Sequence, residues 1–361
     1  MRNNEFEDII SIAEEIAQGK RYSKDFVQEN IVSLLNFDIK ELYDFIKPLL
    51  QGELKLVMLG ILWTLCDLKK IRIPEEIATT PYAGLGHPRL FNVPQEYGGM
   101  YADIYGNATG KYAGMYATFH GKSKATGKYA GMYATFSDLS QATGEYAGIR
   151  AKFLDLSQAT GKYSAKDATF SDNSQATGKY AGMGATFLNF SQATGKYAGM
   201  HATFSDLSQA TGKYAGMHAT FSDLSQATGK YAGMGATFLN FSQATGKGAG
   251  MYATFSDDSK ATGILSGAYG LFRNDSKATG ILSGAYGLFR NDSKATGKGA
   301  GMYATFSDNS KATGKYAGIR ATFLDISQAT GKYAGIGATF LGKATGRSVA
   351  STQDFIKRDY K

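Results

Sequence analysis

The sequence has one cysteine, Cys66, and only five prolines in 361 residues. A single thiol cannot form an internal disulfide, so the fold cannot depend on disulfide bridges. Four of the five prolines fall within residues 71–94, which predicts a linker or an irregular lead-in at that point.

Long hydrophobic runs are also missing. The longest strongly apolar run, residues 56–66, has 11 residues, whereas a membrane-spanning helix needs about 20. The first fifteen residues are acidic and helix-like, without the basic and apolar pattern of a signal peptide. We therefore expect a cytoplasmic protein, with export by a route that lacks a cleaved signal as the alternative.

What the sequence does contain is a repeat of 17 residues, typified by Ser191–Leu207. We number its positions from the serine, so that Ser191 is position 1 and Leu207 is position 17. A fixed short period predicts one elongated body built from stacked turns rather than several globular domains. The glycine at position 5 recurs without a slip, and a last copy follows two residues early at Gly346: Gly110, Gly127, Gly144, Gly161, Gly178, Gly195, Gly212, Gly229, Gly246, Gly263, Gly280, Gly297, Gly314 and Gly331.

The repeat predicts a mainly β fold, a β-solenoid of about 14–17 turns. Two fixed glycines would each cost about 1 kcal/mol inside a helix, and helical repeats have units from about 33 residues. Positions 10–14 read Met-x-Ala-Thr-Phe, and alternation would turn Met, Ala and Phe inward. Gln-Ala-Thr-Gly-Lys-Tyr predicts a second strand with Ala and Gly inward. Ser-Asp-x-Ser and the glycine at position 9 would form the corners.

Four segments follow from these patterns: an α-helical head at 1–80, a lead-in with irregular first turns at 81–109, the β-solenoid at 110–346 and a tail or cap at 347–361. Apolar spacing in the head predicts four helices forming a small bundle. Ser23 and Asp38 are the expected caps of the second and third helices, and Pro48 should end the third. The fourth, at about 53–69, is apolar nearly all round, so we expect it at the centre.

Two departures from the repeat have open interpretations. Residues 162–170 place Ala165 and Lys166 where Gly and Met are expected, so either that turn bulges or position 10 is less buried than alternation suggests. Residues 260–276 and 277–293 are identical and replace Lys-Tyr by Ile-Leu. That replacement either repacks the core or creates an apolar contact surface. The side chains concerned are Ile264, Leu265, Ile281 and Leu282.

Nothing in the sequence predicts a catalytic, cofactor or metal site, so we expect no enzyme. Gly121-Lys122-Ser123 lacks the first glycine of a phosphate-binding loop, and residues 82–86 hold a Gly-x-Gly outside any dinucleotide-binding context. His201 and His218 share position 11 and should stack in adjacent turns, but no Cys, His or carboxylate cluster accompanies them. The glycine- and aspartate-rich nonapeptide of calcium-binding β-rolls is absent.

One ladder of charge remains as a candidate binding site. Lysine occupies position 6 in 11 of 14 regular turns, usually followed by tyrosine, and such a basic, aromatic stripe suits a polyanion such as nucleic acid. The net charge of residues 1–80 is −4 and that of the remainder is +12, which suits either a polyanion partner or attraction between heads and solenoids. The candidate residues are Lys111, Lys128, Lys162, Lys179, Lys196, Lys213, Lys230, Lys247, Lys298, Lys315 and Lys332.

The sequence favours a non-enzymatic structural or protein-interaction scaffold, because added repeats change length and valency more than local chemistry. The partner would be a protein, or a second copy of the chain, contacting the head or a solenoid face. Polyanion binding and a self-assembling filament are the alternatives. Ice binding or surface adhesion is a further alternative. The threonine ladders are similar in architecture to ice-binding β-solenoids, but the variable position 11 and the flanking lysines argue against an ice-binding face.

Overall fold

The structure is a computed structural model that describes residues 2–46, 51–73 and 75–346. The expected helix end at Pro48 and the expected cap at 347–361 lie outside these residues. The chain divides into two compact units. The first runs to Thr169 and includes Asn173–Gln175, and the second takes in Phe170–Asp172 and the chain from Ala176 onwards.

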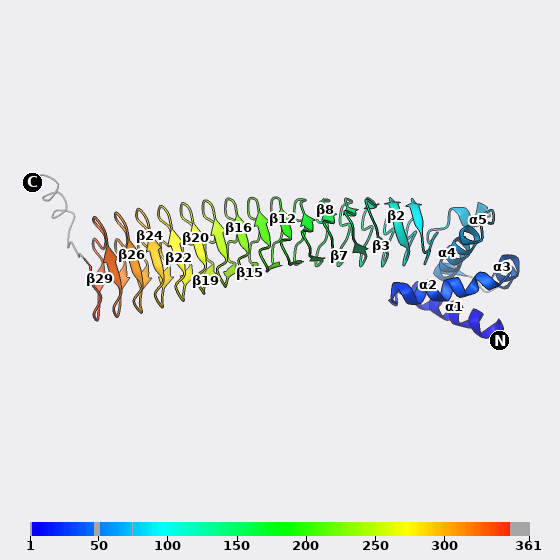
Figure 1. The fold of residues 1–361 in the computed structure, drawn as a ribbon, viewed down its shortest axis with the longest axis horizontal. Coiled ribbons are helices and arrows are strands. Elements are labelled where there is room, and N and C mark those ends of the chain that lie inside the picture. The colour runs from blue at the N-terminus through cyan, green and yellow to red at the C-terminus, as the bar shows by residue number, and fades with distance from the viewer. Residues whose placement is uncertain (1, 47–50, 74, 347–361) are drawn as a thin grey trace, which may run out of the picture. The chain divides into compact units, whose positions relative to one another are not determined.

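Helices occupy only the first part of the first unit (Figure 1). Their bounds are α1 (Arg2–Ala17), α2 (Lys24–Ser33), the 3₁₀ helix η1 (Leu34–Asn36), α3 (Ile39–Ile46), α4 (Gly52–Leu68) and the short α5 (Glu75–Ala78). The four predicted helices are therefore confirmed. No pattern in the sequence predicts α5, which lies in the proline-rich segment.

The predicted helix caps are present. The Ser23 hydroxyl accepts a hydrogen bond from the backbone N–H of Phe26 at 3.3 Å. The Asp38 carboxylate accepts bonds from the N–H groups of Lys40 and Glu41 at 2.8 and 3.1 Å. These side chains satisfy N–H groups that the first helical turn leaves unpaired.

Helix α4 is the central helix of the head, as its apolar sequence predicts. Its residues from Val57 to Leu62 are all buried, and it packs against α1, α2, α3 and α5. Gly60 lies against the first solenoid turn, because a Cβ at that position would lie 2.4 Å from the carbonyl oxygen of Tyr82. The bundle and the first turn therefore share one core within the first unit.

The remainder of the described chain is a parallel β-solenoid of about 15 turns with a spacing of about 17 residues, which confirms the predicted fold class. Each turn contributes two short strands. One strand, Thr-Phe in most turns, covers positions 13 and 14. The other begins with Gln or Lys at position 2 and ends at the alanine of position 3 or the threonine of position 4. Each pairs in parallel with the same residues one turn later, for example Phe204 with Phe221 and Ala210 with Ala227.

The irregular first strands are β1 (Leu90–Val93) and β2 (Asp103–Ala108), followed in the first unit by β3 (Thr118–Phe119), β4 (Lys124–Ala125), β5 (Thr135–Phe136), β6 (Gln141–Ala142), β7 (Lys152–Phe153) and β8 (Gln158–Ala159). At the division between the units lie β9 (Thr169–Phe170) and β10 (Gln175–Ala176). The Thr-Phe type of the second unit comprises β11 (Thr186–Phe187), β13 (Thr203–Phe204), β15 (Thr220–Phe221), β17 (Thr237–Phe238), β19 (Thr254–Phe255), β21 (Leu271–Phe272), β23 (Leu288–Phe289), β25 (Thr305–Phe306), β27 (Thr322–Phe323) and β29 (Thr339–Phe340). The Gln-Ala-Thr type comprises β12 (Gln192–Thr194), β14 (Gln209–Thr211), β16 (Gln226–Thr228), β18 (Gln243–Thr245), β20 (Lys260–Thr262), β22 (Lys277–Thr279), β24 (Lys294–Thr296), β26 (Lys311–Thr313) and β28 (Gln328–Thr330).

The core of each unit's solenoid is a column of phenylalanines at position 14. From Phe119 to Phe323 these side chains are fully buried. Within each unit their rings stack on those of the next turn. Centroid separations are 4.5–4.7 Å in the first unit and 4.6–5.0 Å in the second. Alanines at positions 3 and 12 line the same interior. Burial of each phenylalanine stabilises its turn by roughly 1.5–3 kcal/mol.

The strand predicted over positions 10–14 is shorter in the structure, and the prediction that the methionine at position 10 faces inward is wrong. Position 11 has a left-handed backbone, with φ of 58° at Tyr116 and 55° at His201, so the chain turns immediately before the alanine at position 12. The strand begins only at position 13, and Met200 and Met217 are partly buried at the surface. Only the alanine and the phenylalanine face the core.

The second strand is also shorter than predicted, since it ends at position 3 or 4. The glycine at position 5 does not line the interior. It passes close to the preceding turn, where a Cβ on Gly212 would lie 2.6 Å from the carbonyl oxygen of Gly195. Positions 6–11 then form one continuous turn, and positions 16 and 17 form the other corner with φ of 54° and 63° at Asp206 and Leu207. Both predicted corners are therefore confirmed.

The unusual turn at residues 162–170 does not bulge. The N–H of Ala165 donates to the carbonyl of Ala147 at 2.8 Å, and the carbonyl of Lys166 accepts from Arg150 at 2.8 Å, so the ladder continues. Lys166 is exposed. The alternative that position 10 is less buried is thus the correct one.

Within the described ranges, no helix combines the length and the apolar character needed to cross a bilayer.

Candidate interaction surfaces

The lysines at position 6 form an exposed row on the loop of positions 6–11. All 11 predicted lysines are exposed. Where tyrosine follows, the ammonium group lies over that ring at 4.9–5.6 Å from its centroid, as with Lys196 over Tyr197 at 5.2 Å. The row therefore presents cations interleaved with aromatic rings, as the sequence predicts.

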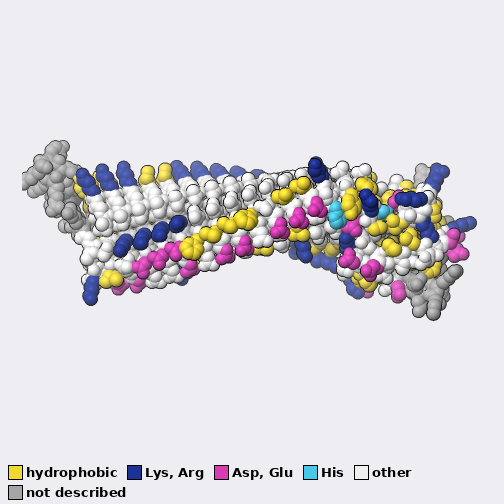
Figure 2. Space-filling view, in the orientation of Figure 1, with side chains coloured by type: hydrophobic (Ala, Val, Ile, Leu, Met, Phe, Trp, Pro, Cys, Tyr) yellow, Lys and Arg dark blue, Asp and Glu magenta, His cyan; other side chains and the backbone are white. Residues whose placement is uncertain are grey.

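These lysines keep most of their charge unpaired. Lys111 lies 3.4 Å from the Glu96 carboxylate, and it is the only lysine of the row that forms an ion pair among the described residues. The aspartates at position 16 belong to the opposite corner of the turn and do not neutralise the row. Figure 2 shows lysine and arginine side chains running along one edge of the second unit, interrupted by hydrophobic ones.

The four histidines do not gather into one site. His201 and His218 stack in adjacent turns with centroids 5.4 Å apart, as expected for position 11. His87 contacts the Asp67 carboxylate at 3.0 Å and His120 contacts that of Asp103 at 2.9 Å. Among the residues that the structure describes, no three His, Cys, Asp or Glu side chains are grouped to hold a metal ion.

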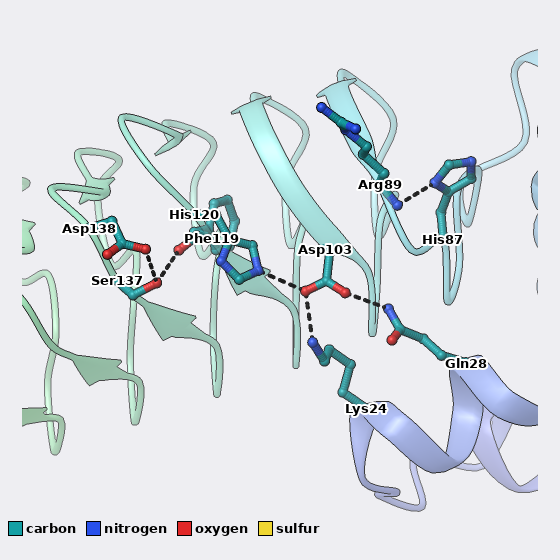
Figure 3. A network of polar contacts seen from close by, with 9 residues as sticks. All are labelled: Lys24, Gln28, His87, Arg89, Asp103, Phe119, His120, Ser137 and Asp138. Atoms are coloured by element: carbon teal, nitrogen blue, oxygen red, sulfur yellow. Dashed lines mark hydrogen bonds and ion pairs between the residues drawn. The ribbon is translucent and has the colours of Figure 1, made fainter.

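Asp103 joins the helical head to the solenoid (Figure 3). Its carboxylate accepts hydrogen bonds from the Lys24 ammonium at 2.7 Å and the Gln28 amide at 3.1 Å, both from α2, and from His120 in the next turn. Burial opposes the charge of this carboxylate, but the hydrogen bonds outweigh burial and hold the pKa of Asp103 below its ordinary value. The contact thus attaches α2 to the solenoid within the first unit.

The His87 side chain is buried, and its hydrogen bonds fit a neutral imidazole. Its Nδ1 accepts from the backbone N–H of Arg89 at 3.0 Å, which leaves the proton on Nε2 to be donated to Asp67. Burial lowers the pKa of His87, although the hydrogen bond and the charge of Asp67 act in the opposite direction. Likewise, burial raises the pKa of the Cys66 thiol, which disfavours a reactive thiolate.

A second aromatic row runs along position 11, which the sequence indicated only as a variable position. In the first unit, Tyr101, Tyr116 and Tyr133 stack with centroids 4.9 and 5.1 Å apart. The loop between α1 and α2 covers this row. The Arg21 guanidinium lies 4.1 Å from the centre of the Tyr133 ring and donates to its hydroxyl at 2.8 Å. The backbone N–H of Tyr22 donates to the Tyr101 hydroxyl at 3.4 Å.

A cavity of about 240 Å³ lies under the end of α1. Its lining brings together Ile16 with side chains from positions 7, 10 and 11 of the first turns, including Tyr97, Met100, Tyr101 and Tyr116. These three repeat positions therefore share one surface. The consecutive tyrosines at position 11 could have revealed this row in the sequence, but not the segment that covers it.

The Ile-Leu copies place apolar side chains on the surface and keep the buried phenylalanine column. Phe272 and Phe289 remain fully buried in those turns, whereas the exposed fractions of Ile264 and Ile281 are 46% and 48%. The two isoleucines are therefore not taken into the core, as core repacking would require of them. The structure instead shows an apolar interruption of the lysine row.

No model of a known protein family matches the chain, and neither a curated protein nor a solved structure matches it with significance.

Proposed function

We propose that the protein is a non-enzymatic interaction scaffold, in which stacked turns present the same groups to a partner again and again. One observation supports this above the others: the Phe column and the in-register strands make successive turns interchangeable, while the exposed Lys, Tyr and Asp side chains form rows. Catalysis needs a few unlike groups that converge on one point, and rows of like groups do not provide them.

Removal of whole turns tests this proposal. Deletion of residues 192–225 joins Ser191 to Gln226 and removes two complete repeats in phase. We expect a folded chain with an unchanged β-type circular dichroism spectrum per residue and a proportionate loss of binding capacity for any multivalent partner.

A matched control removes residues 192–217, which joins Ser191 to His218 out of phase. This deletion breaks the register of the Phe column and should disrupt the strands around it. If the in-phase deletion unfolds the chain as severely as the out-of-phase one, the turns are not interchangeable and the scaffold proposal is wrong.

The unpaired lysine row favours a second candidate function, the binding of a polyanion such as single-stranded nucleic acid. Lysines recur once per turn, about 4.8 Å apart along each ladder, with tyrosine rings between them. Such a surface attracts a charged backbone and offers rings on which bases stack.

Substitution of four lysines by glutamine tests the second candidate. The salt dependence of binding to a single-stranded oligonucleotide should lose about 3 from its log–log slope, because each phosphate contact contributes about 0.7. The substituted residues are Lys179, Lys196, Lys213 and Lys230. A control with equal loss of charge substitutes the position-2 lysines, which have no tyrosine beside them in sequence: Lys260, Lys277, Lys294 and Lys311. Equal effects of both variants, or binding that does not depend on salt, would exclude a specific role for the row.

A further inference from the structure

One surface of the second unit departs from the repeat. From Tyr146 to Tyr231, position 7 is tyrosine and position 11 is another residue in every turn. In the next four turns the pattern reverses, since position 11 is tyrosine and position 7 is glycine or leucine. A reversal confined to four consecutive turns marks a local surface. Its tyrosines, here called the exposed tyrosine row, are Tyr252, Tyr269, Tyr286 and Tyr303.

The row is continuous and open to solvent. Successive rings stack with centroids 5.1, 4.9 and 4.9 Å apart. The exposed fractions of the four side chains are 59%, 49%, 51% and 40%, whereas that of Tyr101 in the first unit is 0%. A Cβ on Gly299 would meet the Leu282 side chain at 2.9 Å and the Met302 sulfur at 3.1 Å, so positions 7 and 10 lie side by side here as well.

The first unit shows what such a row binds. There, Tyr101, Tyr116 and Tyr133 are covered by the end of α1, which supplies Ile16 to the cavity, and by the loop that follows α1, which supplies Arg21 to the last ring. An arginine over a tyrosine ring combines cation–π attraction with a hydrogen bond to the hydroxyl. The occupant is thus an apolar helix end followed by an arginine.

In both rows the hydroxyl of the last tyrosine accepts a hydrogen bond from an arginine of the next turn, but within the part of the chain that the structure describes, only in the first unit does it also accept one from a second arginine. The hydroxyl of Tyr133 accepts from Arg150 of the next turn at 2.9 Å and from Arg21 at 2.8 Å. Tyr303 accepts from Arg320 of the next turn at 3.2 Å, and no second arginine reaches it among the described residues.

Charge agrees with an arginine-bearing occupant. In the first unit, Lys111 lies at position 6 beside the tyrosine row and forms an ion pair with Glu96. In the second unit the two central turns place Ile264 and Ile281 where lysine would stand, which removes two positive charges from the edge of the row. The substitution removes the ammonium groups at position 6 and adds apolar area there, while Arg273 and Arg290 of the same turns place their charge at position 15, in the other corner of the turn.

We propose that the exposed tyrosine row is a docking site for a partner protein's helix end that presents apolar side chains followed by an arginine, the chemistry of residues 16–21 of this chain. This inference rests on the proposed scaffold function and names its partner. The row would bind one partner at one place, whereas the lysine row is repeated along the chain.

The test uses a labelled peptide with the sequence of residues 8–24 and capped ends, titrated into the full chain and followed by fluorescence anisotropy. We expect saturable binding that weakens about tenfold when Arg21 of the peptide is replaced by alanine, the loss expected for one cation–π contact with its hydrogen bond. The double variant Tyr269→Ser/Tyr286→Ser of the full chain should weaken binding to a similar extent.

The control variant Tyr197→Ser/Tyr214→Ser removes two stacked rings at position 7 of the same unit and should leave binding unchanged. Absence of binding, binding that ignores Tyr269 and Tyr286, or equal loss in the control would overturn the proposal. Sedimentation that shows a dimer lost in the Tyr269/Tyr286 variant would assign the row to a second copy and overturn it too. A failure here leaves the in-phase deletion result untouched, so the two proposals fail separately.

Discussion

Glycine occupies positions 5 and 9 for different physical reasons. Gly212, at position 5, has φ of 134°, and a Cβ would lie 2.6 Å from the backbone oxygen of Gly195. Gly216, at position 9, has φ of 62°, and a Cβ would meet the end of the Phe221 ring at 2.5 Å. Position 9 is held by Ala165 in one turn, with φ of 53°. Backbone atoms cannot move aside as a side chain can, so position 5 is the stricter one.

Gly212→Ala should therefore destabilise the chain more than Gly216→Ala. We expect Gly212→Ala to lower the free energy of unfolding by about 3 kcal/mol or more. We expect Gly216→Ala to lower it by about 1–2 kcal/mol, the cost of left-handed strain. Chemical denaturation of both variants in parallel measures the order. A larger loss for Gly216→Ala would contradict the steric explanation.

The serine at position 1 forms a buried polar column that the sequence does not explain. These side chains are fully or almost fully buried, and only Ser140 and Ser157 are joined by a hydroxyl contact, at 3.4 Å. Buried hydroxyls without a partner are uncommon, because burial removes their bonds to water. The hydroxyls with no partner are those of Ser123, Ser174, Ser191, Ser208, Ser225, Ser242, Ser259, Ser276, Ser293, Ser310 and Ser327.

Ser208→Ala should leave stability unchanged or raise it by up to about 1 kcal/mol, since it removes a polar group that forms no bond. Ser208→Thr is the steric control and should lower stability, because an extra methyl group in a close-packed interior displaces its neighbours. Thermal unfolding of both variants checks this. A clear loss of stability in Ser208→Ala would show that the hydroxyl is bonded.

At the scale of the elements, α2 is attached to β2 through Asp103, which makes the head sensitive to acid. The pKa of Asp103 is lowered in the folded chain, so its contribution is present above the ordinary aspartate value of 3.8 and is lost as pH falls through the folded value. His87 acts earlier. Its folded pKa lies below the ordinary 6.5, so the unfolded chain takes up the proton first and stability falls as pH drops below 6.5.

We expect the first unit to lose stability in two steps on acidification, one below pH 6.5 and one below pH 3.8. His87→Gln should remove the first step, because glutamine takes up no proton, and Asp103→Asn should remove the second. Fluorescence of Trp63, which lies 6.1 Å from the His87 ring, reports on this region during denaturation at each pH. A profile unchanged by both substitutions would contradict the assignment.

At the scale of the whole molecule, the lysine row repels itself. Exposed lysines recur turn after turn within each unit, and only Lys111 has a described carboxylate partner. Folding holds these charges about 4.8 Å apart along each ladder, whereas unfolding separates them.

Salt should therefore stabilise the chain. Raising ionic strength from about 0.01 M to about 1 M shortens the Debye length from about 30 Å to about 3 Å and screens the repulsion. We expect the melting temperature to rise, and to rise less in the variant with four position-6 lysines replaced by glutamine. Equal salt effects in both proteins would show that the repulsion contributes little to stability.

The sequence by itself determined the parallel solenoid, its period and its inward phenylalanines. Identical residues recur at equal spacing, and a side chain such as Phe204 can be buried only by stacking on its copies. The helix caps at Ser23 and Asp38 were equally predictable, because a cap depends on neighbours within a few residues.

Only the tertiary structure decided where Met200 lies and that Ile264 is exposed. Alternation assumes an extended backbone, and the left-handed residues at positions 7, 11, 16 and 17 bend each turn in ways that propensity disfavours and stacking enforces. It also decided that Arg21 meets Tyr133, 112 residues away. Such a contact depends on the path of the chain between the two residues, which the local sequence around neither of them specifies.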